Sequence, residues 1–379
     1  MNAIRNISSL TAAAGNGRKK IIITGGGTGG HIFPAIAIGK ALQAIEVEME
    51  ILFVGARGKM EMEKVPQAGY DIVGITIAGF DRSAIWKNWK LPFQLIIGFW
   101  QVMQLFRQFK PTAVVGVGGY ASFPVMRYAQ LKGIDTYIHE SNSFAGKSNQ
   151  LLGKKASAIF VATPGMEKFF PAEKIVVTGN PVRHEIEENT LPRAEAFKMF
   201  GLKEGLPVVL VMGGSLGARS INDAVAQQLA ILSEKVQLIW QTGKNNADHY
   251  AAVAALYPGV YINTFIYQMD AAYVAADIIV SRSGAMSVAE ICLSGKASIL
   301  VPYPLAAEDH QTANARYLTD RKAALLIPDQ EATKELVPLI LQLAQNNELR
   351  NELGAAVRTL AVRNAAPAIA QYILKHSYA

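Results

Sequence analysis

The chain has 379 residues, of which 50% are hydrophobic and 18% are charged, and its formal net charge at pH 7 is +7. This composition excludes a disordered chain, and the length is sufficient for two globular domains that each bury a core. The single cysteine, Cys292, excludes a disulfide framework and a thiolate-rich metal site. The basic cluster 18–20 follows a stretch of small residues, the wrong order for a signal peptide, so we interpret the N-terminus as the loose leader of a cytoplasmic protein.

The first expected element is a β-branched strand at 21–24, which continues directly into the glycine-rich segment 25–30. Glycine allows the backbone to turn sharply and to approach a ligand closely. A helix is expected next, with Pro34 in its first turn, and the free amides at its N-terminus favour an anion. The sequence therefore predicts an anion-binding loop between the first strand and the first helix.

Two other motifs resemble this loop in part. Three of its glycines have the G-x-G-x-x-G spacing of dinucleotide-binding folds, but no acidic residue follows the expected second strand, 49–54, to hold the ribose. Arg57 could bind a ribose phosphate there, which leaves an NADP-dependent oxidoreductase as an alternative. A P-loop is excluded, because His31 and Ile32 stand where a lysine and a serine or threonine must hold phosphate and magnesium.

Polar residues follow two further expected strands of the first half. The strand at 113–117 leads to Tyr120, and the strand at 136–138 leads to the polar segment 139–142. Because ligands of open parallel sheets bind at the carboxyl ends of the strands, we expect these residues to share one rim with the glycine loop. For Asn142 the alternative is a role as a helix cap.

The second half repeats this design, with a strand at 208–211 that continues into the glycine-rich segment 213–217. A strand at 277–280 precedes Ser283, the expected N-cap of a helix in which Glu290 lies two turns from the start. A carboxylate suits a nucleoside ribose because it accepts hydrogen bonds from two hydroxyl groups. Two glycine loops, each opening its own half, predict paired nucleotide-fold domains of the α/β class with parallel sheets. Further strands are expected at 175–177, 236–240, 260–266 and 298–302.

Basic residues are concentrated in the first half. Residues 1–180 carry 20 Lys and Arg against 11 Asp and Glu, a net charge of +9, whereas residues 181–379 carry 17 against 19, a net charge of −2. The segment 82–132 holds seven basic residues, no acidic residue and many aromatic ones. Cationic residues beside exposed aromatic side chains favour an anionic membrane surface, and packing in a core helix is the alternative for the apolar residues.

The expected membrane anchors are Trp86 and Trp89, which are flanked by Lys87 and Lys90. The apolar run 91–106 is too short and too interrupted to span a bilayer, so the contact would be peripheral. No basic reading helix and no zinc-finger spacing occur, and we expect no nucleic-acid partner. Because there is no Asp-x-Asp motif and adjacent acidic and histidine residues are poor chelators, we expect no metal site. No cofactor is expected either.

Seven motifs stand in order along nearly the whole chain: GGGTGGHIFPA, GVGGYASFP, HESN and FAG on either side of Ser143, GNPVR, GGSLGAR, RSGAMSVAE and EDHQTANA. Together they resemble the MurG family of bacterial UDP-N-acetylglucosamine transferases, which convert lipid I to lipid II. The resemblance implies a GT-B glycosyltransferase, with two Rossmann-like domains that face across a cleft and an inverting, metal-independent reaction at the sugar carbon. Ser141 and Leu216 stand where glutamine is common in the family, a departure that leaves the function intact and affects only local sugar contacts.

The resemblance also implies a division of labour between the domains. The N-terminal domain, 1–180, joined by a C-terminal helix at about 357–379, would meet the lipid acceptor, and the C-terminal domain, 181–356, would hold the UDP-N-acetylglucosamine. N-acetylglucosamine would pass to the C4 hydroxyl of the muramyl sugar of lipid I. Peripheral attachment to the cytoplasmic face of the bacterial plasma membrane is implied as well, with other cell-wall synthesis proteins as further partners.

Roles for individual residues of the donor site follow from the same resemblance. The uracil would lie against the backbone near Ile266, and Glu290 would bind the ribose hydroxyls. Ser215 and Arg183 would bind the diphosphate. Five consecutive residues would line the nucleotide sugar, namely Ala285, Met286, Ser287, Val288 and Ala289.

The sugar and the acceptor side involve a second set of residues. By resemblance, Gln311 and Asn142 would contact the N-acetylglucosamine. The first loop would close the cleft through Thr28, Gly29 and Gly30.

The reaction requires a base for the acceptor hydroxyl. His31 is the leading candidate because it lies at the mouth of the acceptor-side loop, and Glu140 is the second. For His31 the alternative is a positioning or phosphate-binding role. A non-catalytic UDP-sugar-binding protein and an epimerase on the same fold are the other functional alternatives.

Overall fold

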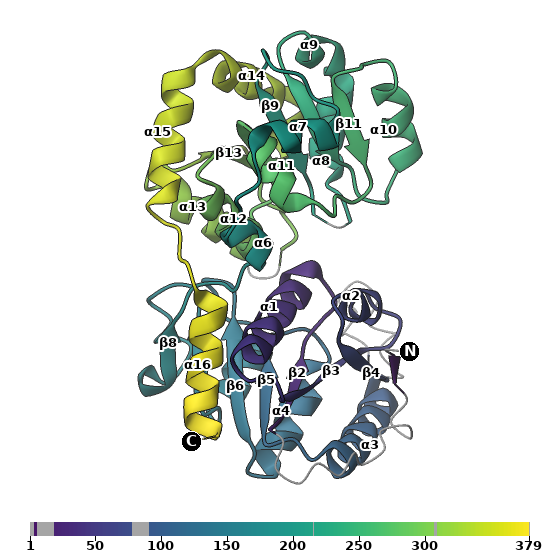
Figure 1. The fold of residues 1–379 in the computed structure, drawn as a ribbon, viewed down its shortest axis with the longest axis vertical. Coiled ribbons are helices and arrows are strands. Elements are labelled where there is room, and N and C mark those ends of the chain that lie inside the picture. The colour runs from purple at the N-terminus through teal and green to yellow at the C-terminus, as the bar shows by residue number, and fades with distance from the viewer. Residues whose placement is uncertain (1–3, 6–18, 78–90, 215, 307–308, 379) are drawn as a thin grey trace. The chain divides into compact units, whose positions relative to one another are not determined.

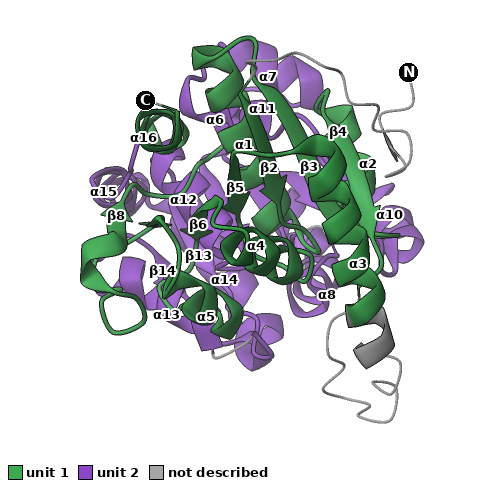
Figure 2. Ribbon diagram, turned by 90° about the horizontal axis from the view of Figure 1, so that it is seen from below, with its two compact units in different colours: residues 1–182, 364–379 green, residues 183–363 purple. Residues whose placement is uncertain are grey.

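Two parallel sheets organise the computed structural model of this chain (Figure 1), which describes all residues except 1–3, 6–18, 78–90, 215, 307–308 and 379. Of residues 4–5 and 91–95 only the backbone is described. The chain divides into unit 1, residues 1–182 with 364–379, and unit 2, residues 183–363 (Figure 2). The sequence placed these boundaries two and seven residues earlier, after 180 and 356.

The sheet of unit 1 has eight strands in the order β1-β4-β3-β2-β5-β6-β7-β8, and all neighbours are parallel. From β4 to β7 this is the 3-2-1-4-5-6 order of a Rossmann fold. The strands are β1 (Ile4–Arg5), β2 (Lys20–Thr24), β3 (Glu50–Ala56), β4 (Asp71–Ile75), β5 (Ala113–Gly116), β6 (Asp135–Glu140), β7 (Ala158–Val161) and β8 (Ile175–Val177). The sequence did not predict β1, β4 or β7.

Helices cover both faces of this sheet, and the alternation of side chains along β2 explains how. Ile21 and Ile23 pack with α1 and α16, whereas Ile22 packs with the helices of the other face, α3, α4 and α5. The helices are α1 (Gly29–Ile45), α2 (Glu61–Gln67), α3 (Leu91–Phe109), α4 (Ser122–Leu131), α5 (Lys147–Gly153), the short 3₁₀ helix η3 (Ala172–Lys174) and α16 (Ala365–Ser377). In Figure 1, α1 and α16 lie side by side on one face.

Two details of these helices correct the sequence predictions. Helix α1 begins at Gly29, so Pro34 is its sixth residue and lies inside the helix rather than in the first turn. The C-terminal helix that joins unit 1 was expected to start at about 357, but it is α16, which begins at Ala365. The preceding helix, α15 of unit 2, continues to Arg358. The side chain of Ser377 fixes the end of α16 to β6, with its Oγ 2.6 Å from Tyr137 Oη and 3.0 Å from Asp135 Oδ2.

The sheet of unit 2 has six parallel strands in the order β11-β10-β9-β12-β13-β14, which is the same 3-2-1-4-5-6 order. The strands are β9 (Val208–Met212), β10 (Gln237–Gln241), β11 (Val260–Asn263), β12 (Ile278–Ser281), β13 (Ala297–Leu300) and β14 (Leu325–Leu326). The strand expected at 260–266 is therefore shorter, and β14 was not predicted.

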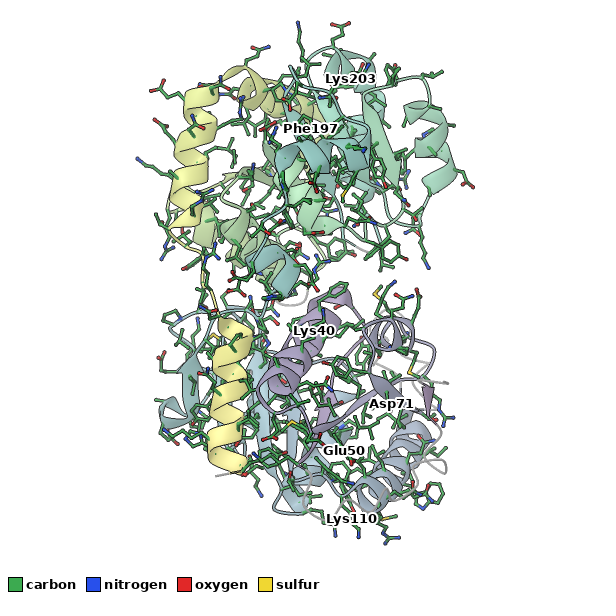
Figure 3. The ribbon with its side chains drawn as sticks, in the orientation of Figure 1. Lys40, Glu50, Asp71, Lys110, Phe197 and Lys203 are labelled. Carbon is green, nitrogen blue, oxygen red and sulfur yellow. The ribbon has the colours of Figure 1, made fainter. Side chains whose placement is uncertain are left out.

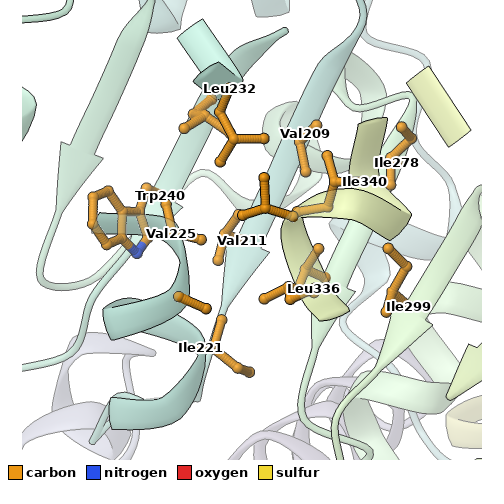
Figure 4. Close-up of a cluster of buried hydrophobic side chains, with 14 of the residues drawn as sticks. Val209, Val211, Ile221, Val225, Leu232, Trp240, Ile278, Ile299, Leu336 and Ile340 are labelled. Carbon is orange, nitrogen blue, oxygen red and sulfur yellow. The ribbon is translucent and has the colours of Figure 1, made fainter. Parts of the chain in front are cut away.

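One face of the unit 2 sheet carries a large apolar core, which Figure 4 shows in close-up. Val209 and Val211 of β9 contact Ile221 and Val225 of α8 and Leu336 of α14. The helices are α6 (His184–Glu187), α7 (Arg193–Phe200), α8 (Arg219–Gln227), α9 (Leu229–Ser233), α10 (Ala247–Ala254), α11 (Met269–Ala275), α12 (Ala285–Ser294), α13 (His310–Thr319), η5 (Asp329–Glu331), α14 (Ala332–Gln345) and α15 (Asn347–Arg358). On the other side of β9, α11 packs against α7.

Charged residues stand at the amino ends of the unit 1 strands. Glu50 begins β3, Asp71 begins β4 and Lys110 precedes β5; all three are labelled in Figure 3. Glu50 forms an ion pair with Lys20 at 3.1 Å. Because the sheet is parallel, the glycine loops lie at the opposite, carboxyl edge, where the candidate site is found.

Candidate functional site

Each sheet has a switch point. This is the place between two neighbouring strands from which successive strands are added in opposite directions across the sheet. In unit 1 it lies between β2 and β5, and in unit 2 between β9 and β12. Ligands of such folds bind outside the carboxyl ends of the strands at this point. The two glycine loops, 25–30 and 213–217, follow β2 and β9, so each stands at the switch point of its own unit.

Backbone packs directly on backbone at the switch point of unit 1. Gly26 N donates to Gly118 O at 3.3 Å, and Gly118 and Gly119 have φ values of +96° and +89°. A Cβ atom added to Gly119 would overlap with the backbone of Gly26. These positions therefore require glycine both for their conformation and for the close approach of the two loops.

The N-terminus of α1 supplies the free donors of the first loop. Thr28 is the N-cap in an extended conformation, and the amides of Gly29 and Gly30 form no hydrogen bond within the described part of the chain. The amide of Gly27, by contrast, donates to Glu61 Oε2 at 2.9 Å. The predicted anion site is thus narrower than the whole loop, and it consists of the first-turn amides of a 17-residue helix.

His31 lies on this first turn with one ring nitrogen held by the loop. Its Nδ1 is 3.1 Å from Gly26 O and 3.4 Å from Thr28 Oγ1. Because a carbonyl oxygen only accepts, Nδ1 carries the proton in the contact with Gly26, and Nε2 of the neutral ring has the lone pair. Nε2 faces Gly118, where an added Cβ atom would be 2.9 Å away. Nε2 is therefore the nitrogen that can act as a base.

Glu140, the second candidate for the base, is committed to its own loop. It is 4% exposed and accepts hydrogen bonds from Asn142 N at 3.1 Å, Asn142 Nδ2 at 3.4 Å, Gly146 N at 3.2 Å and Asn149 Nδ2 at 2.9 Å. This arrangement favours a positioning role over proton transfer. The N-cap of α5 is Gly146, so Asn142 is not a helix cap.

The neighbouring residues on the rim differ in their access to solvent. His139 is completely buried, and burial lowers the pKa of its imidazole to about 4, so it is neutral near pH 7. Tyr120 is 53% exposed just beyond β5. Of the rim residues expected from the sequence, His139 thus faces the protein interior, whereas Tyr120 is available to a ligand.

The second glycine loop is built like the first. Gly214 and Gly217 have φ values of +85° and +83°, and a Cβ atom on Gly217 would overlap with Thr242 O. Leu216 is exposed at the tip of the loop. Ser215, the predicted diphosphate ligand, lies outside the described residues.

Gln241, which the sequence analysis did not single out, connects this loop to Ile266, the residue expected near the uracil. Its Oε1 accepts from Ile266 N at 2.9 Å, and its Nε2 donates to Gly214 O at 3.2 Å. The amide of Ile266 is therefore occupied by Gln241. The signal in the sequence was a buried strand, β10, that ends in a polar side chain.

Glu290 and Arg183, assigned to different parts of the donor, lie together in unit 2. Glu290 is buried, and its Oε1 accepts from Arg183 Nη2 at 2.9 Å and Nε at 3.3 Å, while its Oε2 accepts from Tyr273 Oη at 2.9 Å. Burial, followed by the Glu290 charge, raises the pKa of Tyr273 well above its ordinary value, so its hydroxyl remains a donor. Burial lowers the pKa of Arg183, but Glu290 outweighs this effect and raises it overall. Oε1 uses both of its lone pairs for Arg183, whereas Oε2 accepts one hydrogen bond from Tyr273 and retains a lone pair for a ribose hydroxyl.

The start of α12 differs from the sequence prediction. Gly284 is the N-cap, while Ser283 is fully buried and donates through its Oγ to Gln311 O at 2.8 Å. Gln311 in turn accepts from Tyr303 N at 3.0 Å through its Oε1. Ser283 therefore ties the first turn of α12, with the predicted sugar-lining residues 285–289, to the start of α13.

Comparison with known proteins decides the family. Models of the glycosyltransferase family 28 N-terminal and C-terminal domains match residues 21–161 and 208–369. The crystal structure of Acinetobacter baumannii MurG matches with a TM-score of 0.72 and 29% identity, over 94% of this chain and 99% of that one. A relative from Porphyromonas gingivalis is 50% identical over 95% of this chain and 96% of its own length. The chain belongs to the MurG family, within glycosyltransferase family 28.

The relatives in the MurG family carry one enzyme name. The Porphyromonas gingivalis protein and a Bacteroides fragilis protein, 45% identical over 94% of this chain and 95% of its own length, are each named UDP-N-acetylglucosamine–N-acetylmuramyl-(pentapeptide) pyrophosphoryl-undecaprenol N-acetylglucosamine transferase. Membership confirms the predicted glycosyltransferase fold with two Rossmann-like domains. The UDP-GlcNAc 2-epimerase of Neisseria meningitidis, with a TM-score of 0.62 and 14% identity, shares the fold alone.

The described residues contain neither a membrane-spanning helix nor a cluster of metal ligands. None of the helices there is long and apolar enough to cross a bilayer. Within the same residues, no group of three or more His, Cys, Asp or Glu side chains is placed to hold a metal ion.

Proposed function

We propose that this chain transfers N-acetylglucosamine from UDP-N-acetylglucosamine to the C4 hydroxyl of the muramyl sugar of lipid I, which gives lipid II. The full-length relatives at 45–50% identity support this activity by their shared name. The observation that carries it is the contrast between the switch points, since one presents a ribose-type carboxylate, Glu290, and the other presents free helix amides beside His31.

The donor half of the proposal lies within unit 2. Glu290 accepts a hydrogen bond from the ribose hydroxyls through Oε2, and Arg183 and Tyr273 hold its carboxylate in place. The carbonyl of Ile266 accepts from the uracil, because Gln241 already occupies the amide. Loop 213–217 lies next to this site through Gln241 and takes the diphosphate by its backbone amides.

Residues of the first turns of α12 and the start of α13 complete the donor half. Residues 285–289 line the nucleotide sugar, and Gln311 contacts the N-acetylglucosamine through its Nε2, since its Oε1 is bound to Tyr303. Ser283 keeps these two segments together. Asn142 of unit 1 is the second proposed sugar contact.

The acceptor half of the proposal lies within unit 1. The amides of Gly29 and Gly30, with Thr28, bind the acceptor, and Tyr120 contributes an exposed ring nearby. His31 Nε2 takes the proton of the C4 hydroxyl while that oxygen forms a bond to the anomeric carbon. The bond from the anomeric carbon to the diphosphate breaks, and UDP leaves with the bonding electrons. A single in-line displacement of this kind inverts the configuration.

We also propose that the protein works at the cytoplasmic face of the bacterial plasma membrane, held there peripherally through α3. Ile96 and Trp100 of α3 are 69% and 54% exposed, and Ile97 and Phe99 are exposed beside them. Anionic lipids attract basic residues next to such a surface. The anchors predicted from the sequence, Trp86, Lys87, Trp89 and Lys90, lie outside the described residues. Other cell-wall synthesis proteins remain proposed partners.

The NADP-dependent alternative has no support from the site. It depended on Arg57, whose Nε donates to Gly74 O at 2.9 Å within the protein.

The experiment that tests the proposal measures UDP release from UDP-N-acetylglucosamine with and without a lipid I analogue. We expect release that requires the acceptor and equals the amount of disaccharide product. Tight binding of the nucleotide sugar without acceptor-dependent release would instead identify a UDP-sugar-binding protein. Release of free N-acetylmannosamine would identify an epimerase.

A further inference from the structure

Glu61 is a buried carboxylate on α2 that no motif of the sequence singled out. It is 1% exposed, and within the described residues its partners are two backbone amides: Oε1 accepts from Ala56 N at 3.0 Å and Oε2 from Gly27 N at 2.9 Å. No basic side chain forms an ion pair with it in that part of the chain. A buried charge is costly, so its retention at this place calls for a reason.

Two glycines make room for this side chain. A Cβ atom on Gly26 would overlap with the Glu61 carboxylate, and one on Gly55 would overlap with Glu61 Cγ. The carboxylate therefore lies directly beneath the first turn of the glycine loop, and the loop and the end of β3 are both shaped around it.

One peptide group connects Glu61 to His31. The peptide between Gly26 and Gly27 donates its N–H to Glu61 Oε2 at 2.9 Å and accepts at its oxygen, 3.1 Å from His31 Nδ1. Hydrogen bonds in a chain polarise one another, so a carboxylate on the N–H side makes the carbonyl oxygen a stronger acceptor. The geometry is that of a carboxylate–histidine pair in which a peptide group stands between the two partners.

We propose that Glu61 is a positioning residue for the transfer reaction, which acts through the Gly26–Gly27 peptide to hold His31 with its proton on Nδ1 and its lone pair on Nε2. The same contact stabilises the imidazolium that forms when Nε2 takes the acceptor proton, as the carboxylate of a Ser-His-Asp triad does by direct contact. This inference rests on the proposed function of His31 as the base.

Glu61 is linked to His31 by the hydrogen bonds of the Gly26–Gly27 peptide. The first turn of α1 contains no acidic residue. From β6 the neighbouring titratable group is His139, whose pKa burial lowers to about 4, and which is therefore neutral during turnover near pH 7.

The test combines the pH profile of kcat with the NMR signals of the imidazole nitrogens in the full chain. Glu61→Gln keeps the shape of the side chain but removes its charge. We expect its kcat to fall about ten-fold or more, with the KM for UDP-N-acetylglucosamine unchanged within about two-fold, because that substrate binds to unit 2. The acidic limb of the profile and the NMR pKa of His31 should both shift to lower pH. Glu61→Asp, which keeps the charge, should recover part of the rate.

Glu63→Gln is the matched control, since Glu63 lies on the same helix with an exposed side chain. It should change neither the rate nor the His31 pKa. An unchanged His31 pKa in a folded Glu61→Gln variant would overturn the proposal. If that variant does not fold, the unmodified protein decides, because a neutral His31 with its proton on Nε2 contradicts the proposed role. The NMR result does not depend on activity, so it separates failure of this inference from failure of the proposed function.

Discussion

The two switch points of this protein share one fold but present different chemistry. Each follows the same strand order, and each has a glycine loop in which backbone packs on backbone. In unit 1 the loop leaves helix amides free and holds a histidine ring. In unit 2 the loop is bound by an amide side chain, Gln241, and the nearby acceptor is the carboxylate of Glu290. The comparison teaches that the Rossmann framework fixes where a ligand lies. A few side chains next to each loop determine the chemistry that the site offers to this ligand.

The largest expected effect separates proton transfer from nucleotide binding. His31→Ala should lower kcat about 100-fold or more, as loss of a general base does, and leave the affinity for UDP-N-acetylglucosamine within a few-fold. Steady-state kinetics and calorimetry of the same preparation provide both values. Lys40→Ala, an exposed position on α1 labelled in Figure 3, is the control. A near-normal kcat for His31→Ala would show that His31 is not the general base.

The next effect concerns the response of the two units to acid. The pKa of His139 is about 4 in the folded chain against an ordinary value of 6.5, so the unfolded chain binds this proton first as pH falls. Its contribution to stability is therefore complete above pH 6.5 and is lost as the pH falls towards 4, a loss on the order of 3 kcal/mol. In unit 2, His184 and His249 are exposed and His310 is half-buried. Amide hydrogen exchange at pH 7 and pH 4.5 should show a larger loss of unfolding free energy in unit 1 than in unit 2.

His139→Asn provides the check on this interpretation, because the amide does not titrate in this range. The variant should lose less unfolding free energy than the unmodified chain between the two pH values. Equal losses in both proteins would assign the acid sensitivity of unit 1 to other groups.

A smaller effect is expected when the carboxylate of unit 2 is removed. Glu290→Ala should weaken binding of UDP by about 2 kcal/mol, or about 30-fold, because a charged hydrogen-bond acceptor for the ribose is lost. Calorimetry measures the affinity, and thermal unfolding shows whether Arg183 and Tyr273 tolerate the loss of their partner. Glu195→Ala, at an exposed position on α7, should bind UDP normally. Unchanged affinity in a folded Glu290→Ala variant would exclude this residue from the donor site.

The smallest effect concerns membrane contact, which the proposal assigns to unit 1. Replacing Ile96 and Trp100 of α3 by serine should lower binding to anionic vesicles about five- to ten-fold, because exposed apolar area is removed. Binding of the unmodified protein should also fall as salt rises. The double substitution Leu256→Ser and Ile231→Ser, at exposed positions of unit 2, is the control. Equal co-sedimentation of all three proteins would place the membrane contact elsewhere.

How far the sequence could predict this site depends on the distance along the chain over which each contact forms. Most of the strands, the two glycine loops and the positions of His31 and Glu290 were visible because each depends on a short local pattern, whereas β1, β4, β7 and β14 were missed. Glu61 was not visible, since the loop residue it binds, Gly27, is 34 positions away. Tyr273 was missed for a similar reason, because its hydroxyl reaches Glu290 only once α11 and α12 have packed in the same unit.

The errors at helix starts have a local cause that patterns describe poorly. Pro34 indicated a first turn, but the preceding glycines and Thr28 adopt the helix start themselves. Ser283 is a preferred capping residue, yet its hydroxyl is drawn to the carbonyl of Gln311 and the cap falls to Gly284. In both cases a tertiary contact or a neighbouring backbone conformation outweighed the residue preference.

The central claim, that unit 2 holds the donor while unit 1 performs the proton transfer, is tested most directly by single-turnover transfer rates at saturating UDP-N-acetylglucosamine. Under this condition a defect in donor binding is compensated, whereas a defect in chemistry is not. Glu290→Ala should therefore recover to within a few-fold of the unmodified rate, and His31→Ala should remain about 100-fold slower. Recovery of His31→Ala by excess donor, together with persistent loss in Glu290→Ala, would contradict the assignment of the two units.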